Sequence, residues 1–199
     1  MKIIKKIFFN ILNSVLELSK SKNSLKFLGL ISTIESIFFP IPPDIFLIPI
    51  ALTKKYKWLF LGAFTTITSV IGGILGYLIG AFFWDIIGSF IINFYNGTDE
   101  IDSLKELFQK HGWMVILIAG LTPVPYKVFT ISSGFLSLNI FVFIFCSILS
   151  RGLRFISLAY LVSKYGNRGV KLLERHFGKT CILIVLLLIG IGYVFLLYK

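Results

Sequence analysis

The residues best suited to chemistry in this sequence are charged side chains that lie inside otherwise apolar segments. Two carboxylates, Glu35 and Asp44, occur in the first half, and three bases, Lys127, Arg151 and Arg154, occur in the second. Ionisable groups within a membrane are energetically costly and usually functional. Together with one neighbouring tyrosine they are our candidates for substrate binding or proton coupling: Glu35, Asp44, Tyr126, Lys127, Arg151 and Arg154.

Each charged candidate has more than one interpretation. Glu35 could carry a proton, because burial in hydrocarbon favours a neutral carboxyl group, or it could bind a structural arginine of the other half. Asp44 and Lys127 could simply be solvated at a membrane surface. Arg151 and Arg154 share a helix face at a spacing of three residues. They could extend to the cytoplasmic interface, or face inward and bind a phosphate, Glu35 or Asp44.

The composition indicates a membrane domain around these residues. The chain has 199 residues, of which 56% are hydrophobic and 15% are charged, and its formal net charge is +11. A soluble globule of this size lacks the interior to bury so much apolar side chain, and a disordered chain would be less hydrophobic. The basic residues lie in short runs beside apolar segments, as in loops that face anionic lipid, so we expect no nucleic-acid partner.

The sequence lacks the patterns typical of enzymes and metalloproteins. We find no metal-ligand spacing, no nucleophile with a general base, and no phosphate-binding loop followed by Lys-Ser/Thr. We therefore expect no metal, no cofactor and no enzymatic activity.

Periodicity and length divide most of the chain into interfacial and spanning helices of one all-α domain. Residues 1–20 are predicted to form an amphipathic helix on the membrane surface, and residues 99–111 an amphipathic connector on the opposite surface. The apolar stretches 58–92, 139–162 and 181–198 reach the roughly 20 residues that a spanning helix needs. The first of them is longer, so it should tilt or continue along the interface.

The two remaining apolar segments, 27–52 and 113–136, contain all six prolines. Proline removes a backbone donor and clashes with the preceding turn, so clustered prolines break a helix. Broken backbone at membrane depth survives only inside protein or beside a water-filled cavity. We therefore predict two re-entrant helical hairpins, each entering and leaving the bilayer on one side. The hairpin-forming residues are Pro40, Pro42, Pro43, Pro123 and Pro125.

The two halves of the chain resemble each other at an offset of 83 residues. Residues 40–46 (PIPPDIF) align with residues 123–129 (PVPYKVF), which places Asp44 opposite Lys127. Each half contains a hairpin and then a span, with opposite predicted orientations, as in the inverted repeats of secondary transporters. The tips of two such hairpins should meet, so Asp44 and Lys127 could form a charge pair or a substrate site.

Small residues predict where a hairpin packs. Four glycines in the 58–92 segment lie at roughly helical spacing, which lets another backbone approach closely. We interpret them as the seat of a hairpin: Gly72, Gly73, Gly76 and Gly80.

The charges of the loops predict the orientation. Residues 54–57 carry three lysines, residues 163–179 a net charge of +4, and residues 93–112 a net charge of −2. Basic loops are cytoplasmic. The N-terminus should therefore be cytoplasmic and Lys199 should lie on the opposite side.

In their order along the chain, these motifs resemble the DedA family, of the VTT or SNARE-associated Golgi type, and most closely its YqaA-like branch. The resemblance covers about residues 25–165. It is carried by Glu35 with residues 39–44 (FPIPPD), 72–80 (GGILGYLIG), 120–127 (GLTPVPYK), 133–134 (SG) and 151–155 (RGLRF). It implies a bacterial inner-membrane protein with two facing re-entrant hairpins, and the family's membrane-embedded acids correspond to Glu35 and Asp44.

The resemblance also implies movement of phospholipid or polyprenyl-phosphate lipid between leaflets, in some members linked to protons. Many members carry arginines around the second proline motif, in a pattern such as F-x-R-x-x-P-G-x-R, whereas here the basic group is Lys127, one place later. We expect a transporter of an anionic lipid, and this transporter could form a homo-oligomer. The alternatives are a proton-coupled transporter of a small solute or ion and a non-transporting membrane-homeostasis or assembly factor.

Overall fold

The structure is a computed structural model that describes residues 17–19, 21–38, 42–95, 98–122, 125–166 and 168–169. These ranges contain helices and connecting turns but no strand. The main helices are α2 (Ser24–Glu35), α3 (Asp44–Leu52), α4 (Trp58–Tyr95), α5 (Thr98–Leu121), α6 (Tyr126–Phe135) and α7 (Ile140–Tyr165). Most of the predicted surface helix, the predicted span 181–198, Pro40 and Pro123 lie outside the described residues.

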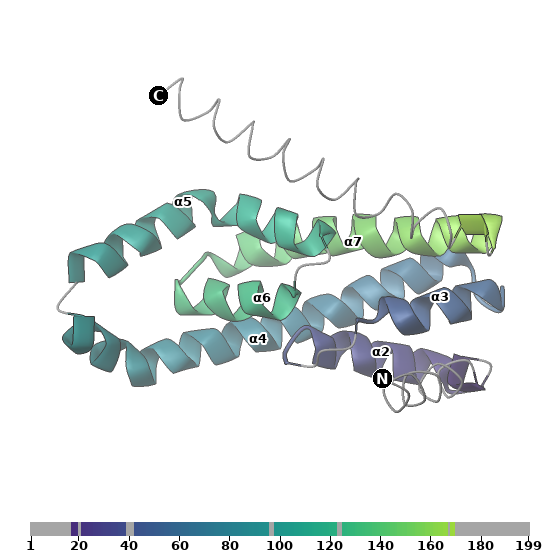
Figure 1. Cartoon of the computed structure of the whole chain (residues 1–199), viewed down its shortest axis with the longest axis horizontal. Helices are drawn as coiled ribbons and strands as arrows, with labels where there is room; N and C mark the ends of the chain where they lie inside the picture. The colour runs from purple at the N-terminus through teal and green to yellow at the C-terminus, as the bar shows by residue number, and fades with distance from the viewer. Residues whose placement is uncertain are drawn as a thin grey trace, which may run out of the picture.

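Two helical hairpins point toward each other along the length of the molecule. Helices α2 and α3 fold back on one another, as do the last part of α5 and α6 (Figure 1). The two hairpins extend from opposite ends, and their turns meet near the middle (Figure 1). The long helices α4 and α7 run in opposite directions beside them (Figure 1). The C-terminal ends of α2 and α5 and the N-terminal ends of α3 and α6 therefore lie near one another (Figure 1).

The packing relates the two halves in a reciprocal way. The first arm of each hairpin packs on the long helix of its own half, α2 on α4 and α5 on α7. The second arm packs on the long helix of the other half, α3 on α7 and α6 on α4. Helices α6 and α7 begin one residue earlier than the offset of 83 predicts from the starts of α3 and α4.

One predicted boundary is wrong. The sequence predicts a separate connector over residues 99–111, followed by a hairpin that starts at 113, but α5 runs without a break from Thr98 to Leu121. Gly112, the residue directly after the predicted connector, lies inside this helix. A glycine within a helix costs only about 1 kcal/mol relative to alanine, which the packing of a long helix overcomes. A Cβ at this position would lie 3.0 Å from side-chain atoms of Leu138 and Phe108, so close packing accounts for the glycine.

The long helices expose mainly apolar side chains, and their buried faces contain hydroxyl groups as well as apolar side chains. Trp58–Phe83 in α4 and Ile140–Tyr165 in α7 are each 26 residues long and apolar enough to cross a membrane. Only 39% of the most apolar window of each is buried. Large apolar residues on their outer faces are exposed, whereas many hydroxyl groups are buried. Large contiguous apolar surfaces are rare on soluble monomers, so this distribution supports α4 and α7 as membrane-spanning helices.

Candidate functional site

The candidate site lies where the turns of the two hairpins meet beside α7. Helix α2 ends at Glu35 and α3 begins at Asp44, directly after Pro43. Helix α5 ends at Leu121 and α6 begins after Pro125. Proline suits the residues that start a helix, because no intrahelical partner exists there for the missing N–H group. The prolines thus open both hairpins and leave helix ends whose polar groups need partners.

Arg151 on α7 is the most deeply buried charge of the site, with 2% of its side chain exposed. Its Nη2 lies 2.7 Å from Oε2 of Glu35, and its Nε donates a hydrogen bond of 2.8 Å to the hydroxyl of Ser69 on α4. Nη2 also lies 3.4 Å from the hydroxyl of Ser36, beside Glu35. A buried charge is tolerated when it is both paired and hydrogen-bonded, and Arg151 meets both conditions.

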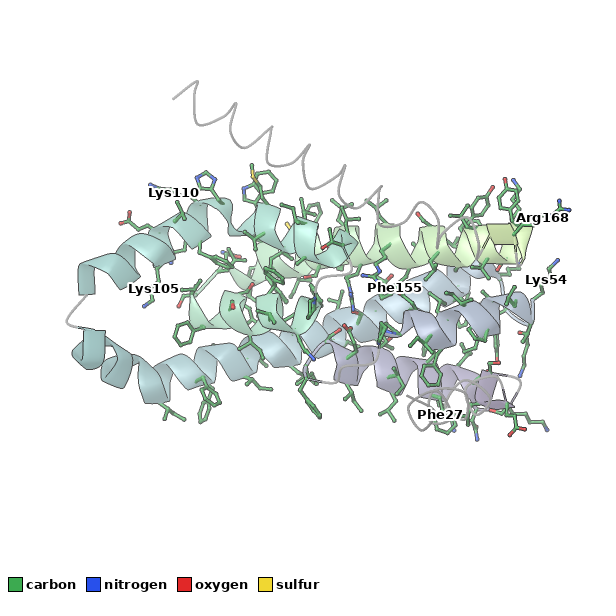
Figure 2. The ribbon with its side chains drawn as sticks, in the orientation of Figure 1. Phe27, Lys54, Lys105, Lys110, Phe155 and Arg168 are labelled. Carbon is green, nitrogen blue, oxygen red and sulfur yellow. The ribbon has the colours of Figure 1, made fainter. Side chains whose placement is uncertain are left out.

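Two aromatic rings complete the surroundings of Arg151. Its guanidinium carbon lies 4.4 Å from the ring centre of Tyr126 and 4.8 Å from that of Phe155. The hydroxyl of Tyr126, a fully buried residue, donates to the hydroxyl of Ser147 on α7. Figure 2 shows Phe155 near the centre of the molecule. A desolvated cation over a ring gains about 2 kcal/mol. Arg151 therefore contacts both hairpins, the first through Glu35 and the second through Tyr126.

Arg154, one turn further along α7, joins both hairpins directly. Its Nη2 donates to Oδ2 of Asp44 at the start of α3, and its Nη1 donates a hydrogen bond of 2.8 Å to the carbonyl oxygen of Thr122 after α5. A carboxylate is favourable at a helix N-terminus, and a cation at a helix C-terminus. Both charges therefore lie where the adjacent helix dipoles stabilise them.

Lys127 does not pair with Asp44, although the aligned repeats suggested that it could. Its Nζ donates to the carbonyl oxygen of Phe38, in the turn of the first hairpin, at 3.1 Å. Asp44 pairs instead with Arg154, because α3 packs against α7 rather than against α6. Among the described residues no carboxylate lies within 4 Å of Lys127. Its ammonium group therefore carries the uncompensated positive charge of the site.

Both hairpins rest on the glycine stripe of α4. At Gly72 a Cβ would lie 2.1 Å from the backbone oxygen of Thr33 in α2, and at Gly80 it would lie 1.9 Å from the backbone oxygen of Ile131 in α6. The two glycines between them face side chains of α6 at Tyr126 and Thr130. The close approach expected for one hairpin thus occurs for both. The stripe consists of Gly72, Gly73, Gly76 and Gly80.

Several polar residues of the site escaped the analysis of the sequence. Ser36, Ser69, Thr122 and Ser147 all contact a candidate residue, and Thr130 donates a hydrogen bond of 3.1 Å to the carbonyl oxygen of Ser36. The cluster of hydroxyl residues over 65–69 in an otherwise apolar helix was the available signal, because such residues face protein rather than lipid. No group of ligands that could hold a metal ion occurs within the described ranges.

Comparison with known proteins identifies the family. The model of the VTT domain matches residues 39–164, a range that contains Asp44, Lys127, Arg151 and Arg154 but not Glu35. An uncharacterized protein of Haemophilus influenzae is 35% identical over 170 residues, which cover 85% of this chain and 88% of the relative. An uncharacterized HI0703 homolog of Histophilus somni is 31% identical over 163 residues, which cover 82% and 85%. No solved structure matches. The chain therefore belongs to the VTT-domain family, which is the DedA family that its sequence motifs resemble.

Proposed function

We propose that the protein moves an anionic lipid, a phospholipid or a polyprenyl phosphate, across the bacterial inner membrane. The observation that carries the proposal is the charge cluster between the hairpin turns. Arg151, Arg154 and Lys127 supply three positive charges and Glu35 and Asp44 two negative ones, in a molecule whose long helices are apolar outside. Such a site attracts an anionic group, and family membership supports a transporter-like role.

The binding chemistry follows from the partners of the bases. Both arginines bind carboxylates, and the guanidinium geometry that suits a carboxylate also suits a phosphate. A proton taken up by a carboxylate would remove its negative charge, so that a phosphate could replace it beside the arginine. Lys127, whose charge no described carboxylate compensates, would make the first contact with the head group. The lipid tail would stay in the bilayer, against the exposed apolar faces of α4 and α7.

The transport pathway would use the hairpins as two re-entrant halves of an inverted repeat. Three observations support this arrangement: the hairpins point in opposite directions, their second arms exchange partners between halves, and equivalent helices start at nearly equivalent positions (Figure 1). In secondary transporters with inverted repeats, the substrate site lies between such broken elements, and the two halves alternately open to each side. We place the loop that carries Lys54, Lys55 and Lys57, and the N-terminus, in the cytoplasm.

The test is lipid movement by the purified full chain. We would reconstitute it in vesicles of phosphatidylethanolamine and phosphatidylglycerol and follow head-group-labelled phosphatidylglycerol and a labelled polyprenyl phosphate, with and without a pH gradient. Lys127→Ala should slow movement about tenfold or more, because a charge-assisted hydrogen bond to the head group is lost. Glu35→Gln should reduce it too. Lys110→Ala, an exposed lysine outside the cluster, is the matched control.

The outcomes separate the proposed function from its rivals. Full activity in both Glu35→Gln and Lys127→Ala would contradict the assigned site. If folded wild-type protein moves neither lipid but admits a small solute or ion, the protein is a solute transporter. If it moves nothing and the variants still restore growth to cells lacking the protein, it is an organising factor.

A further inference from the structure

The Glu35–Arg151 pair is held by hydrogen bonds at three side-chain atoms, Nε and Nη2 of Arg151 and Oε2 of Glu35. Arg151 binds Glu35 and Ser69, and the hydroxyl of Ser36 lies 3.3 Å from Oε2 of Glu35 and 2.9 Å from the hydroxyl of Ser69. The side chains are 2% and 12% exposed for the arginine and the glutamate. The ring of Tyr126 also lies against the guanidinium, with its centre 4.4 Å from the guanidinium carbon. Loss of the glutamate charge would leave a buried, desolvated arginine without its counter-charge.

The Asp44–Arg154 pair is more open. Its side chains are 8% exposed for the arginine and 20% for the aspartate. Oδ2 of Asp44 accepts the bond from Arg154, whereas Oδ1 is buried and has no hydrogen-bond partner within the described part of the chain. A buried carboxylate oxygen without a donor is unfavourable, and a proton on that atom removes the desolvated negative charge. A proton can therefore add at Oδ1 while the bond from Arg154 to Oδ2 persists.

Arg154 also keeps a partner when Asp44 is neutral. Its Nη1 donates to the carbonyl oxygen of Thr122, at the C-terminal end of α5, where the helix dipole favours a cation. On the helices packed against α3, the charged groups of the site are Arg151 and Arg154 from α7 and Glu35 from α2. The other charged residues of α2 and α7 are Lys26 and Lys164, which are exposed. Helix α4 contributes none between residues 58 and 83. Protonation of Asp44 thus changes the charge of this site without removing the support of its arginine.

We infer that the two ion pairs have different roles: Glu35–Arg151 is a fixed clasp, and Asp44–Arg154 is the exchangeable pair. At this pair Asp44 takes up the proton at Oδ1, and Arg154 then binds the phosphate group of the lipid in place of the carboxylate. The inference rests on the proposed function and narrows it, because it assigns proton uptake to Asp44 rather than to Glu35. Arg154 contacts both hairpin turns, so exchange at this pair alters the link between them.

The experiment measures the thermal stability of the purified full chain in detergent, with and without a water-soluble, short-chain phosphatidylglycerol. Without lipid, Glu35→Gln should lower the melting temperature by about 10 °C, because it strands a buried charge. Asp44→Asn should lower it by less than about 4 °C, because Thr122 still holds Arg154. Asp44→Ser, which keeps a polar group at the start of α3, should behave as Asp44→Asn does.

The second measurement is the lipid concentration that raises the melting temperature by half of its maximum shift, at several pH values. In the wild type this concentration should fall as the pH falls, because a proton must displace the carboxylate. In Asp44→Asn and Asp44→Ser it should be about tenfold lower than in the wild type near neutral pH and independent of pH, because the competing charge is absent. In Glu35→Gln the pH dependence should persist.

Two results would overturn the assignment of roles. One is a melting temperature of lipid-free Glu35→Gln equal to that of the wild type, which contradicts the clasp. The other is a pH dependence that disappears in Glu35→Gln and persists in both Asp44 variants, which assigns the exchange to the wrong acid. If the wild type does not respond to the lipid at any pH, the proposed function and the exchange fail together, while the lipid-free melting temperatures still decide the clasp.

Discussion

At the residue scale, Arg151 shows why this site uses arginine. It donates from two different nitrogens to Ser69 and Glu35, and its guanidinium carbon lies 4.4 Å from the ring centre of Tyr126 and 4.8 Å from that of Phe155. Guanidinium is planar and delocalised, so it can stack on rings and donate in fixed directions at the same time. An ammonium group is more compact and more strongly hydrated, and it cannot reproduce this set of contacts.

The first prediction concerns this residue. Arg151→Lys should lower the free energy of unfolding by about 2–3 kcal/mol, because it loses a ring contact and at least one hydrogen bond at a site where water cannot replace them. Thermal unfolding in detergent measures the change. Arg168→Lys, at an exposed position, is the control and should be neutral. An Arg151→Lys protein as stable as the wild type would show that the stacking and the second donor contribute nothing.

The charged residues of the site could be found in the sequence, and pairing of Arg151 or Arg154 with Glu35 or Asp44 was one of the alternatives, but which arginine binds which acid could not be predicted. A charge within an apolar segment is visible at once, and the inward-facing alternative for Arg151 and Arg154 is the one that the structure shows. The choice of partner depends on which helices pack together. The aligned repeats placed Asp44 opposite Lys127. Because α3 packs on α7, however, the partner of Asp44 is Arg154.

At the element scale, the effects of proline on the helices could be predicted from the sequence better than those of glycine. The helix breaks before α3 and α6 follow from proline chemistry, which acts locally and is visible in the sequence. Pro49, by contrast, lies inside α3 without ending it. Gly112, directly after the predicted end of the connector, lies inside α5, because a glycine can end a helix or allow close packing within one. Only the neighbouring elements decide between these roles.

The second prediction compares two glycines that lie in long helices. In Gly80→Ala the new Cβ would lie 1.9 Å from the backbone oxygen of Ile131, so α6 must move away from α4. We expect a loss of about 1–3 kcal/mol in stability, as for other overpacked interiors. In Gly152→Ala the nearest atom is a methyl carbon of Thr66 at 3.7 Å, an ordinary contact. This control should be neutral, or stabilised by up to about 1 kcal/mol through helix propensity.

Thermal unfolding of the two alanine variants in the same detergent provides the measurement. Equal stability of Gly80→Ala and Gly152→Ala would contradict the close packing of α6 on α4. Gly134→Ala, whose Cβ would lie 1.8 Å from the backbone oxygen of Tyr77, approaches the same interface from the other side and should behave as Gly80→Ala does.

At the scale of the whole molecule, the two halves share helices but not charges. The offset of 83 residues relates Arg151 and Arg154 to Thr68 and Ile71, which cannot form ion pairs. The first hairpin is therefore held to α7 by two ion pairs, whereas the second hairpin is held to α4 mainly by close contacts at glycines. Aligned motifs predict a repeat, but they do not show this difference in attachment, which follows from the packing of the helices.

The ends of the molecule also differ in charge, and this difference predicts its orientation. Lys54 and Arg168 lie at the same end (Figure 2), where the exposed Lys55, Lys57 and Lys164 also belong. The opposite end includes the start of α5, whose sequence is acidic over residues 99–106. Because basic loops remain on the cytoplasmic side, we expect the lysine-rich end to face the cytoplasm and the start of α5 to face outward.

The final prediction tests this orientation with single cysteines at two exposed positions, Lys57→Cys and Glu106→Cys. Each is made in a chain that also carries Cys146→Ser and Cys181→Ser, so that the new thiol is the one that reacts. A membrane-impermeant maleimide added to spheroplasts should label Glu106→Cys and not Lys57→Cys, and inside-out vesicles should give the reverse. The reversed result would turn the molecule over while keeping its fold. Labelling of both positions from one side alone would contradict α4 as a membrane-spanning helix, because these residues flank it on either side in the chain.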